Sequence, residues 1–274
     1  MWYVLAASLL FLPFNLRSAL VLLAVVLGLA IFEQVLMPPA IVALIVIGFV
    51  AVYSGTHKQP SAFTLPGEII LVASAFALML HTIPGFNNQL IESAVRAGPQ
   101  SAPFTFYYNL DKALVPFILL ACLPTLLKRP SQPPANGLWW LVLLMSLPLL
   151  LLLATFAGGL RVEPHLPEWL GPFMLANLFF VSLAEEALFR GYIQQRLSQL
   201  LGDKRALIIA ALLFGSVHFS GGLLLVVFAT LAGLIYGLAW LWSGRLWVST
   251  LVHFSFNLLH LLFFTYPMWQ RIPA

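Results

Sequence analysis

Long apolar stretches alternate with short polar breaks along the whole chain. These stretches predict helices near residues 18–36, 39–55, 66–84, 113–127, 137–157, 172–199, 205–219, 222–242 and 246–264, with a short additional helix within 1–14. Most of these helices are close in length to the span of about 20 residues that a helix needs to cross the hydrocarbon core of a bilayer. Proline or glycine marks the breaks, as at Pro38, Pro84 and Gly221. The pattern predicts an all-α fold, a polytopic transmembrane bundle of about eight to ten helices.

The composition agrees with this prediction. Hydrophobic residues make up 61% of the 274 positions and charged residues only 8%, a balance that a soluble domain could not keep in water. The formal net charge is +4, but the basic residues lie in short loops and not in one run or face, which argues against a nucleic-acid partner. The predicted solvent is therefore the lipid bilayer.

The positions of Lys and Arg predict how the bundle is oriented. If the loop with Lys128 and Arg129 is cytoplasmic, alternation of the spans places other basic residues on that side, namely Arg17, Lys58, Arg196, Lys204, Arg205 and Arg245. The opposite side receives Arg96, Lys112, Arg161 and Arg271. Since cytoplasmic loops carry an excess of Lys and Arg, we expect the first group to face the cytoplasm.

A Pro-rich linker at 130–137 divides the chain into two parts. Residues 1–130 hold the N-terminal transmembrane helices and a long connection at 85–112, which is rich in aromatic and amide side chains. We interpret that connection as an ordinary interfacial loop or as a lid that contacts substrate. Residues 131–274 form the C-terminal bundle, which holds nearly all the unusual polar residues. We expect both parts to form one membrane domain.

Two adjacent carboxylates within one span are the first unusual feature. A charged side chain at the centre of a membrane helix costs about 2.5 to 3.5 kcal/mol on an insertion scale, so Glu185 and Glu186 need a reason to be there. Glu186 and Arg190 are four residues apart, share a helix face and can neutralise each other. Glu185 points roughly 100° away from Glu186 and is free for other work.

Two further helices carry polar residues at four-residue spacing. Phe214 and His218 share one face, where the ring of Phe214 can exclude water, and His253 and Asn257 share another. Counted at about 1.5 Å per residue, Glu185 and His218 lie about 21 to 25 Å from the basic loops next to their helices. His253 and Asn257 lie about 12 to 18 Å from the basic loop before their helix. We expect the four polar residues to meet in one layer, reached from the cytoplasmic side. An active site or an ion path is the default interpretation of such a group.

These motifs resemble those of the CPBP family. The order Glu-Glu-x-x-x-Arg at 185–190, Phe-x-x-x-His at 214–218 and His-x-x-x-Asn at 253–257, on successive membrane helices, is similar to CAAX prenyl endopeptidases and to bacterial bacteriocin-processing or immunity proteases. The similarity covers about Phe173 to Leu262. The segment Ala102 to Lys112, with Pro84 to Asn88 before it, is similar to a segment of a bacterial subset of this family.

The resemblance implies an intramembrane protease that uses a glutamate. It assigns Glu185 as the catalytic carboxylate, His218 as its partner in activating water, and His253 with Asn257 as the groups that stabilise the oxyanion. Glu186, Arg190 and Phe214 take supporting roles. The implied partner is a membrane-associated or lipidated protein, or a leader peptide, in a bacterial cytoplasmic membrane. Peptide hydrolysis needs such a base and such donors.

Two alternatives remain open at this stage. Glu185, His218 and His253 could form a two-histidine, one-carboxylate zinc site, although the sequence contains no His-Glu-x-x-His run to strengthen it. The expectation is therefore that no cofactor is needed, with zinc as the alternative. A proton-coupled transporter or a non-catalytic immunity protein could also place ionisable residues in the membrane.

Overall fold

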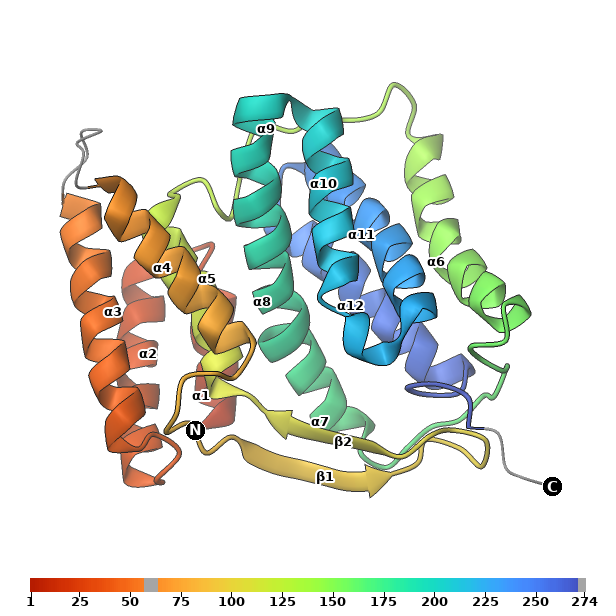
Figure 1. Ribbon diagram of the computed structural model, residues 1–274, viewed down its shortest axis with the longest axis horizontal. Coiled ribbons are helices and arrows are strands. Elements are labelled where there is room, and N and C mark those ends of the chain that lie inside the picture. The colour runs from red at the N-terminus through yellow and green to blue at the C-terminus, as the bar shows by residue number, and fades with distance from the viewer. Residues whose placement is uncertain (57–63, 271–274) are drawn as a thin grey trace.

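The computed structural model describes residues 1–56 and 64–270 and shows a bundle of helices with one small sheet (Figure 1). The N-terminal helices are α1 (Trp2–Phe11), α2 (Leu16–Phe32), α3 (Pro38–Thr56), α4 (Thr64–Met79) and α5 (Leu110–Cys122). The C-terminal ones include α6 (Leu138–Phe156), α10 (Asp203–Ser216), α11 (Leu223–Ser243) and α12 (Leu246–Phe263). The predicted all-α bundle is confirmed, and most observed ends lie within a few residues of those predicted.

One long helix follows α6 in the chain and runs through the middle of the molecule, beside α10 (Figure 1). It consists of α7 (Leu170–Leu175), η1 (Ala176–Ser182), α8 (Leu183–Glu186), η2 (Ala187–Gln194) and α9 (Gln195–Leu201). The segments η1 and η2 are π-helical, with i→i+5 hydrogen bonds, and they flank the adjacent carboxylates on both sides. π-helical segments are rare and are frequently found at functional sites.

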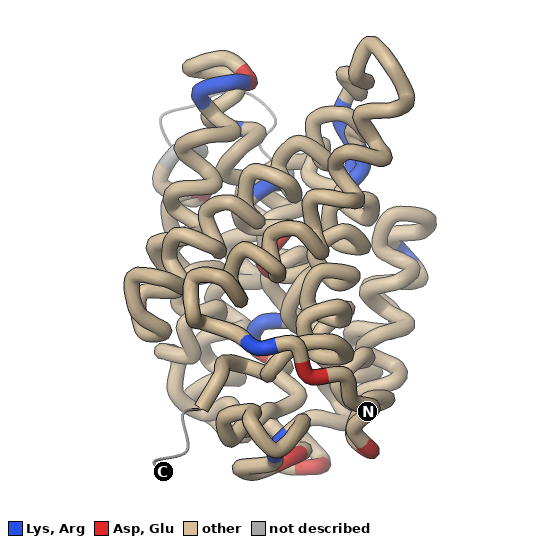
Figure 2. The backbone as a smooth tube through the Cα atoms, turned by 90° about the vertical axis from the view of Figure 1, so that its right-hand side faces the viewer, with Lys and Arg blue, Asp and Glu red and all other residues tan. Residues whose placement is uncertain are grey.

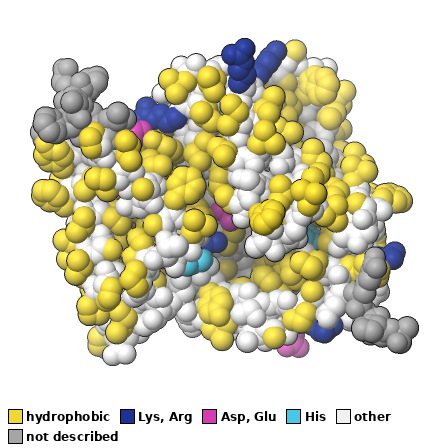
Figure 3. All heavy atoms as spheres, in the orientation of Figure 1, with side chains coloured by type: hydrophobic (Ala, Val, Ile, Leu, Met, Phe, Trp, Pro, Cys, Tyr) yellow, Lys and Arg dark blue, Asp and Glu magenta, His cyan; other side chains and the backbone are white. Residues whose placement is uncertain are grey.

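The outer surface of the bundle is that of an integral membrane protein. Among the described residues, four helices are long and apolar enough to cross a bilayer, namely α6, the long helix 170–201, α11 and α12. Large hydrophobic side chains also point outward, such as Phe49 on α3 and Phe156 on α6, and Figure 3 shows such side chains spread over the visible face. In water this exposure would be unfavourable, whereas in a bilayer these side chains contact lipid tails.

The charges gather at the two ends of the helices, and Figure 2 shows few between them. We call one end the basic end; it carries Lys128, Arg129, Arg196, Lys204, Arg205 and Arg245. Lys128 and Arg245 pair through their backbones there, and Arg129 forms an ion pair with Asp203 at 3.1 Å. Of the residues used to predict the orientation, Lys58 and Arg271 lie outside the described residues.

Asp203 ties the linker to the start of α10 at the basic end. Burial opposes its ionisation, but hydrogen bonds from Gln132 at 2.5 Å and Arg129 at 3.1 Å outweigh that effect and hold the pKa of this carboxyl below its ordinary value. The backbone N–H of Gln132 also donates to the carbonyl of Leu241. The division of the chain near residue 130 stays a prediction.

The opposite end is covered by a β-hairpin, so we call it the hairpin end. Strands β1 (Gln89–Val95) and β2 (Phe104–Tyr108) pair antiparallel within the connection that was predicted as a loop. The prediction missed alternation in β2, where Phe104, Phe106 and Tyr108 are more buried than Thr105 and Tyr107. Phe104 and Phe106 pack on Trp169 and Phe173 of the long helix and its approach. The hairpin is therefore held against the bundle by its aromatic face.

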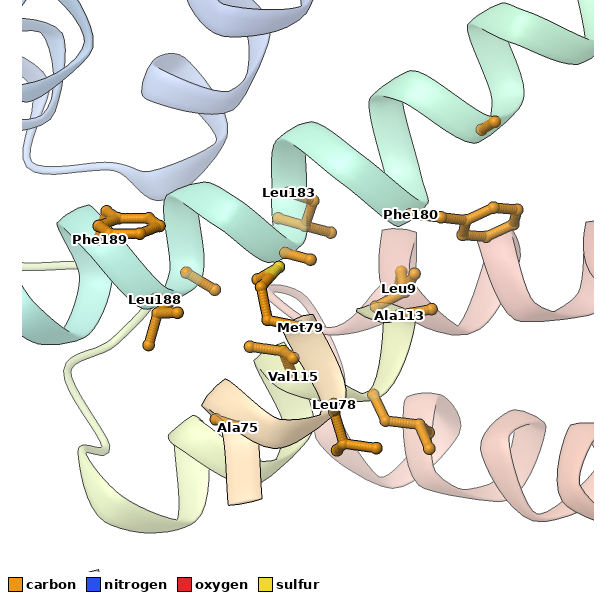
Figure 4. Close-up of a cluster of buried hydrophobic side chains, with 14 of the residues drawn as sticks. Leu9, Ala75, Leu78, Met79, Ala113, Val115, Phe180, Leu183, Leu188 and Phe189 are labelled. Carbon is orange, nitrogen blue, oxygen red and sulfur yellow. The ribbon is translucent and has the colours of Figure 1, made fainter. Parts of the chain in front are cut away.

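Helices α4 and α5 pack against the long helix on the side where Glu185 lies. Figure 4 shows Ala75, Met79 and Val115 from these two helices close to Leu183 and Leu188 of the long helix. Leu183 and Leu188 are almost completely buried. This packing fixes the N-terminal helices beside the polar residues of the C-terminal bundle.

Candidate active site

Glu186 lies at the centre of a closed polar cluster. Its carboxylate is fully buried and accepts hydrogen bonds from Arg190 Nη1 at 2.9 Å, from His253 Nδ1 at 3.0 Å and from the hydroxyl of Ser249. Arginine stays protonated in proteins, so its guanidinium requires a counter-charge in this buried place. Glu186 supplies that charge, and its two oxygens are occupied.

The guanidinium of Arg190 is enclosed by aromatic rings and backbone. Nη2 donates to the carbonyl of Gly233 at 3.1 Å, and the guanidinium carbon lies 4.3 Å from the ring centre of Phe214 and 5.2 Å from that of Tyr236. A Cβ atom on Gly233 would lie only 3.2 Å from Nη2. The glycine thus permits α11 to approach Arg190 closely.

The imidazole of His253 is held between the two adjacent carboxylates. Its ring stacks on Tyr236, with ring centres 4.4 Å apart and planes inclined by 14°. Nδ1 bonds to Glu186, and Nε2 lies 4.0 Å from Oε2 of Glu185. Because the carboxylate of Glu186 accepts, Nδ1 carries a proton and Nε2 faces Glu185. The fully enclosed carboxylate therefore orients the imidazole toward the more open one.

The tautomer of His218, like that of His253, is fixed by an acceptor bonded to its Nδ1 nitrogen. Its Nδ1 lies 2.8 Å from the backbone carbonyl of Phe214. A carbonyl oxygen can only accept, so Nδ1 bears the hydrogen and, in the neutral imidazole, Nε2 keeps a lone pair. The ring of Phe214 packs against this imidazole at 4.8 Å between centres. The second nitrogen is therefore able to accept a proton.

Glu185 and His218 line one cavity of about 340 Å³. Its walls come from α4, the first turn of α5, the long helix, the end of α10 with η3 (Phe219–Gly221), and the start of α11. Most of the lining is apolar, and Lys112 is the third ionisable side chain in it. Figure 3 shows a hollow near the middle of the visible face in which acidic, basic and histidine side chains lie near one another.

The cavity lies toward the hairpin end, and the side of the membrane from which it is reached stays a prediction. The strands connect α4 to α5, so the end of α4 and the start of α5 lie at the hairpin end. Helix α10 starts at the basic end with Asp203, so His218 beyond its end lies far from that end. This position agrees with the depth counted from the sequence, because about 21 to 25 Å from the basic loops is most of an about 30 Å hydrocarbon core.

Asn257 lies outside the lining of this cavity. Its side-chain nitrogen donates to the amide oxygen of Asn177 at 3.2 Å, and that oxygen also accepts from Ser182. The structure thus brings Glu185, Glu186, Arg190, Phe214, His218 and His253 together and places Asn257 one turn further along α12 than His253. One of the two amide protons of Asn257 is used by Asn177.

Several contributing residues were missed by the sequence analysis. Ser249 precedes His253 by four residues, so the spacing that linked His253 to Asn257 could also have identified it. Tyr236 lies between Gly233 and Gly237 on α11 and belongs to none of the three motifs. Lys112 comes from a distant part of the chain, and no spacing relates it to the motifs.

No group of three or more His, Cys, Asp and Glu side chains that could hold a metal ion is found in residues 1–56 and 64–270. The predicted set of Glu185, His218 and His253 is therefore not assembled as a ligand triad in this structure. A zinc-dependent reaction stays an alternative hypothesis for experiment.

Comparison with known proteins gives one finding. Residues 167–259 match the model of the family described as Type II CAAX prenyl endopeptidase Rce1-like. The match spans the long helix, α10, α11 and most of α12, which contain all three motifs. None of the curated proteins and none of the solved structures searched matches the chain.

Proposed function

We propose that this chain, a member of the CPBP family of CAAX-type intramembrane proteases through residues 167–259, hydrolyses a peptide bond by a glutamate-dependent mechanism. The substrate we propose is a membrane-associated or lipidated protein, or a leader peptide. We further propose a multi-pass location in a bacterial cytoplasmic membrane, with the basic end in the cytoplasm. The activity is supported by the geometry of the cavity together with the family match, and the orientation by the Lys and Arg residues at the basic end.

The contrast between two adjacent carboxylates carries the proposal. Glu186 is completely enclosed and neutralised by Arg190, whereas the Glu185 side chain is 15% exposed and lines the cavity. A general base needs access to water, and a carboxylate with both oxygens occupied cannot serve. The arrangement favours Glu185 as the reactive group and Glu186 as the group that supports it.

Water activation follows from the two residues that share the cavity. A water molecule bound between Glu185 and His218 gives a proton to one of them, and its oxygen attacks the carbonyl carbon of the scissile bond. The resulting tetrahedral intermediate collapses when the proton passes to the leaving nitrogen and the C–N bond breaks. These steps need a proton acceptor. Both the Nε2 lone pair of His218 and the carboxylate of Glu185 can accept a proton.

We assign stabilisation of the oxyanion to His253 and Asn257. Glu186 fixes Nδ1–H of His253, so protonation of Nε2 produces a donor beside Glu185. Asn257 keeps a second amide proton besides the one given to Asn177. Donors placed before the reaction lower the barrier because they need no reorganisation when charge develops. A substrate that enters the cavity must bring its carbonyl oxygen toward α12 for both donors to reach it.

A pool of synthetic peptides of varied chemistry tests the proposal. The pool contains unmodified apolar peptides and peptides with a prenylated C-terminal Cys-a-a-X motif. The purified chain in detergent is incubated with the pool in H₂¹⁸O, and new termini are read by mass spectrometry. We expect ¹⁸O in new carboxyl termini, loss of cleavage in His218→Gln, and normal cleavage in the hairpin control Glu92→Gln. A folded wild-type chain that cleaves no peptide contradicts the proposal.

A further inference from the structure

The cavity contains a cation that the proposed chemistry does not use. Lys112 lies in the first turn of α5, which begins at Leu110, and its side chain lines the cavity together with Glu185 and His218. The N-terminal turn of a helix carries a partial positive charge, so a lysine there is unfavourable by itself. Its presence in this turn calls for an anion nearby.

The neighbouring Asp111 does not supply that anion. Its carboxylate, 3% exposed, accepts from Nδ1 of His81 at 2.6 Å and from the side-chain amide of Asn88 at 3.0 Å. It also accepts the backbone N–H of Lys112 at 2.9 Å, while the carbonyl of the Asn88 side chain accepts the N–H of Leu110. These bonds occupy Asp111 and fix the first turn of α5. The backbone from which the Lys112 side chain extends is thus held in place.

Glu185 shares the cavity but does not neutralise the ammonium at close range. Among the described residues, no ion pair within 4.0 Å and no side-chain hydrogen bond involves the Lys112 ammonium. Most of the other side chains that line the cavity are apolar and include Phe76 and Leu188. An unpaired cation beside apolar walls attracts an anion more strongly than one in open water. The space between Lys112 and Glu185 is therefore suited to a molecule that carries its own negative charge.

We propose that Lys112 is a specificity-determining residue that binds a carboxylate of the substrate. The proposal rests on the proposed function, because it assumes that the scissile bond lies at Glu185. The small cavity allows only a short stretch of peptide between the two groups. The carboxylate comes from a free C-terminus close to the cleaved bond or from an Asp or Glu side chain, and both sources present the same chemistry to the ammonium.

Matched peptides separate the two sources. Each cleaved peptide from the pool is made with a free or an amidated C-terminus, and with Asp and Glu kept or changed to Asn and Gln. The wild-type chain and the variants Lys112→Met and Lys112→Arg are compared on all versions in detergent. Lys128→Met, which removes a lysine at the basic end, is the matched control.

We expect Lys112→Met to lower kcat/KM on carboxylate-bearing peptides by about ten- to a hundredfold, mainly through KM. Neutral versions should be cleaved equally by this variant and the wild type, and Lys112→Arg should retain most of the preference. The modification that abolishes the wild-type preference identifies the source of the carboxylate. Lys128→Met should behave as the wild type on every peptide.

Three results overturn the proposal. The first is a wild-type chain with no preference for carboxylate-bearing peptides, which needs no variant to fold. The second is a Lys112→Met chain with unchanged kinetics on every peptide. The third is a Lys112→Met chain that loses kcat equally on all peptides and has a shifted pH profile. That result means that Lys112 acts on the protonation of Glu185 and not on a carboxylate of the substrate. The Glu185→Gln variant tests the proposed function separately from the role of Lys112. If this variant cleaves peptides at the wild-type rate, the proposed function itself is refuted.

Discussion

Replacing Glu186 by glutamine should destabilise the protein strongly, although the change in volume is small. The variant removes the counter-charge of Arg190 and the acceptor of two further donors, His253 and Ser249, in a place without solvent. Removing one partner of a buried ion pair costs about 3 to 5 kcal/mol. At roughly 2 to 4 °C per kcal/mol for a chain of this size class, the melting temperature should fall by about 6 to 20 °C.

The assay is thermal unfolding in detergent, followed by intrinsic fluorescence, for three variants beside the wild type. Glu185→Gln makes the same chemical change one residue away and should melt close to the wild type. Among the described residues, the Glu185 carboxylate has no partner closer than the 4.0 Å contact to His253. The double variant Glu186→Gln with Arg190→Met removes both charges and should recover part of the loss. A Glu186→Gln protein that melts like the wild type refutes the assignment of Glu186 as the buried counter-charge.

The remaining predictions concern catalysis, metal, orientation and pH. Asn257→Ala should lower kcat about a hundred- to a thousandfold with little change in substrate affinity, and unchanged kcat removes it from the oxyanion site. Treatment with a strong chelator should leave activity intact; stoichiometric zinc, with activity lost on stripping and regained on addition, establishes the zinc mechanism instead. In a Cys122→Ser background, an impermeant thiol reagent should label Asn87→Cys in intact cells but label Lys204→Cys only after permeabilisation. The reverse labelling pattern would show that the basic end faces outward. The folded protein lowers the pKa of Asp203, so the stability that this carboxylate contributes is present above its ordinary pKa of 3.8 and is lost as pH falls through the folded value. Asp203→Asn should therefore reduce the difference in melting temperature between neutral and acid pH. An unchanged difference contradicts this prediction.

The helices could be predicted because membrane spans follow from local sequence alone. Each span must satisfy its own backbone in lipid, so an apolar run of sufficient length is already a helix. The same locality explains the pairing of Glu186 with Arg190 and the contact of Phe214 with His218, since four-residue spacing fixes both. These contacts follow from the geometry of a single helix.

Contacts between distant segments could not be predicted in this way. Four-residue spacing indicates that His253 and Asn257 share a face, but not that His253 reaches Glu186 while Asn257 turns to Asn177. The crossing of α12 over the long helix decides this. Lys112 reaches the cavity only because the hairpin returns the chain to the start of α5. Its role depends on long-range packing that no single sequence pattern encodes.

The central claim is that Glu185 provides the base for peptide hydrolysis in the cavity. The most direct measurement is the turnover number of Glu185→Gln relative to the wild type on the same cleaved peptide, at equal amounts of folded protein. The mechanism predicts a fall by several orders of magnitude, because the variant keeps the shape of the side chain but removes the proton acceptor. A folded Glu185→Gln protein that turns over at the wild-type rate contradicts it.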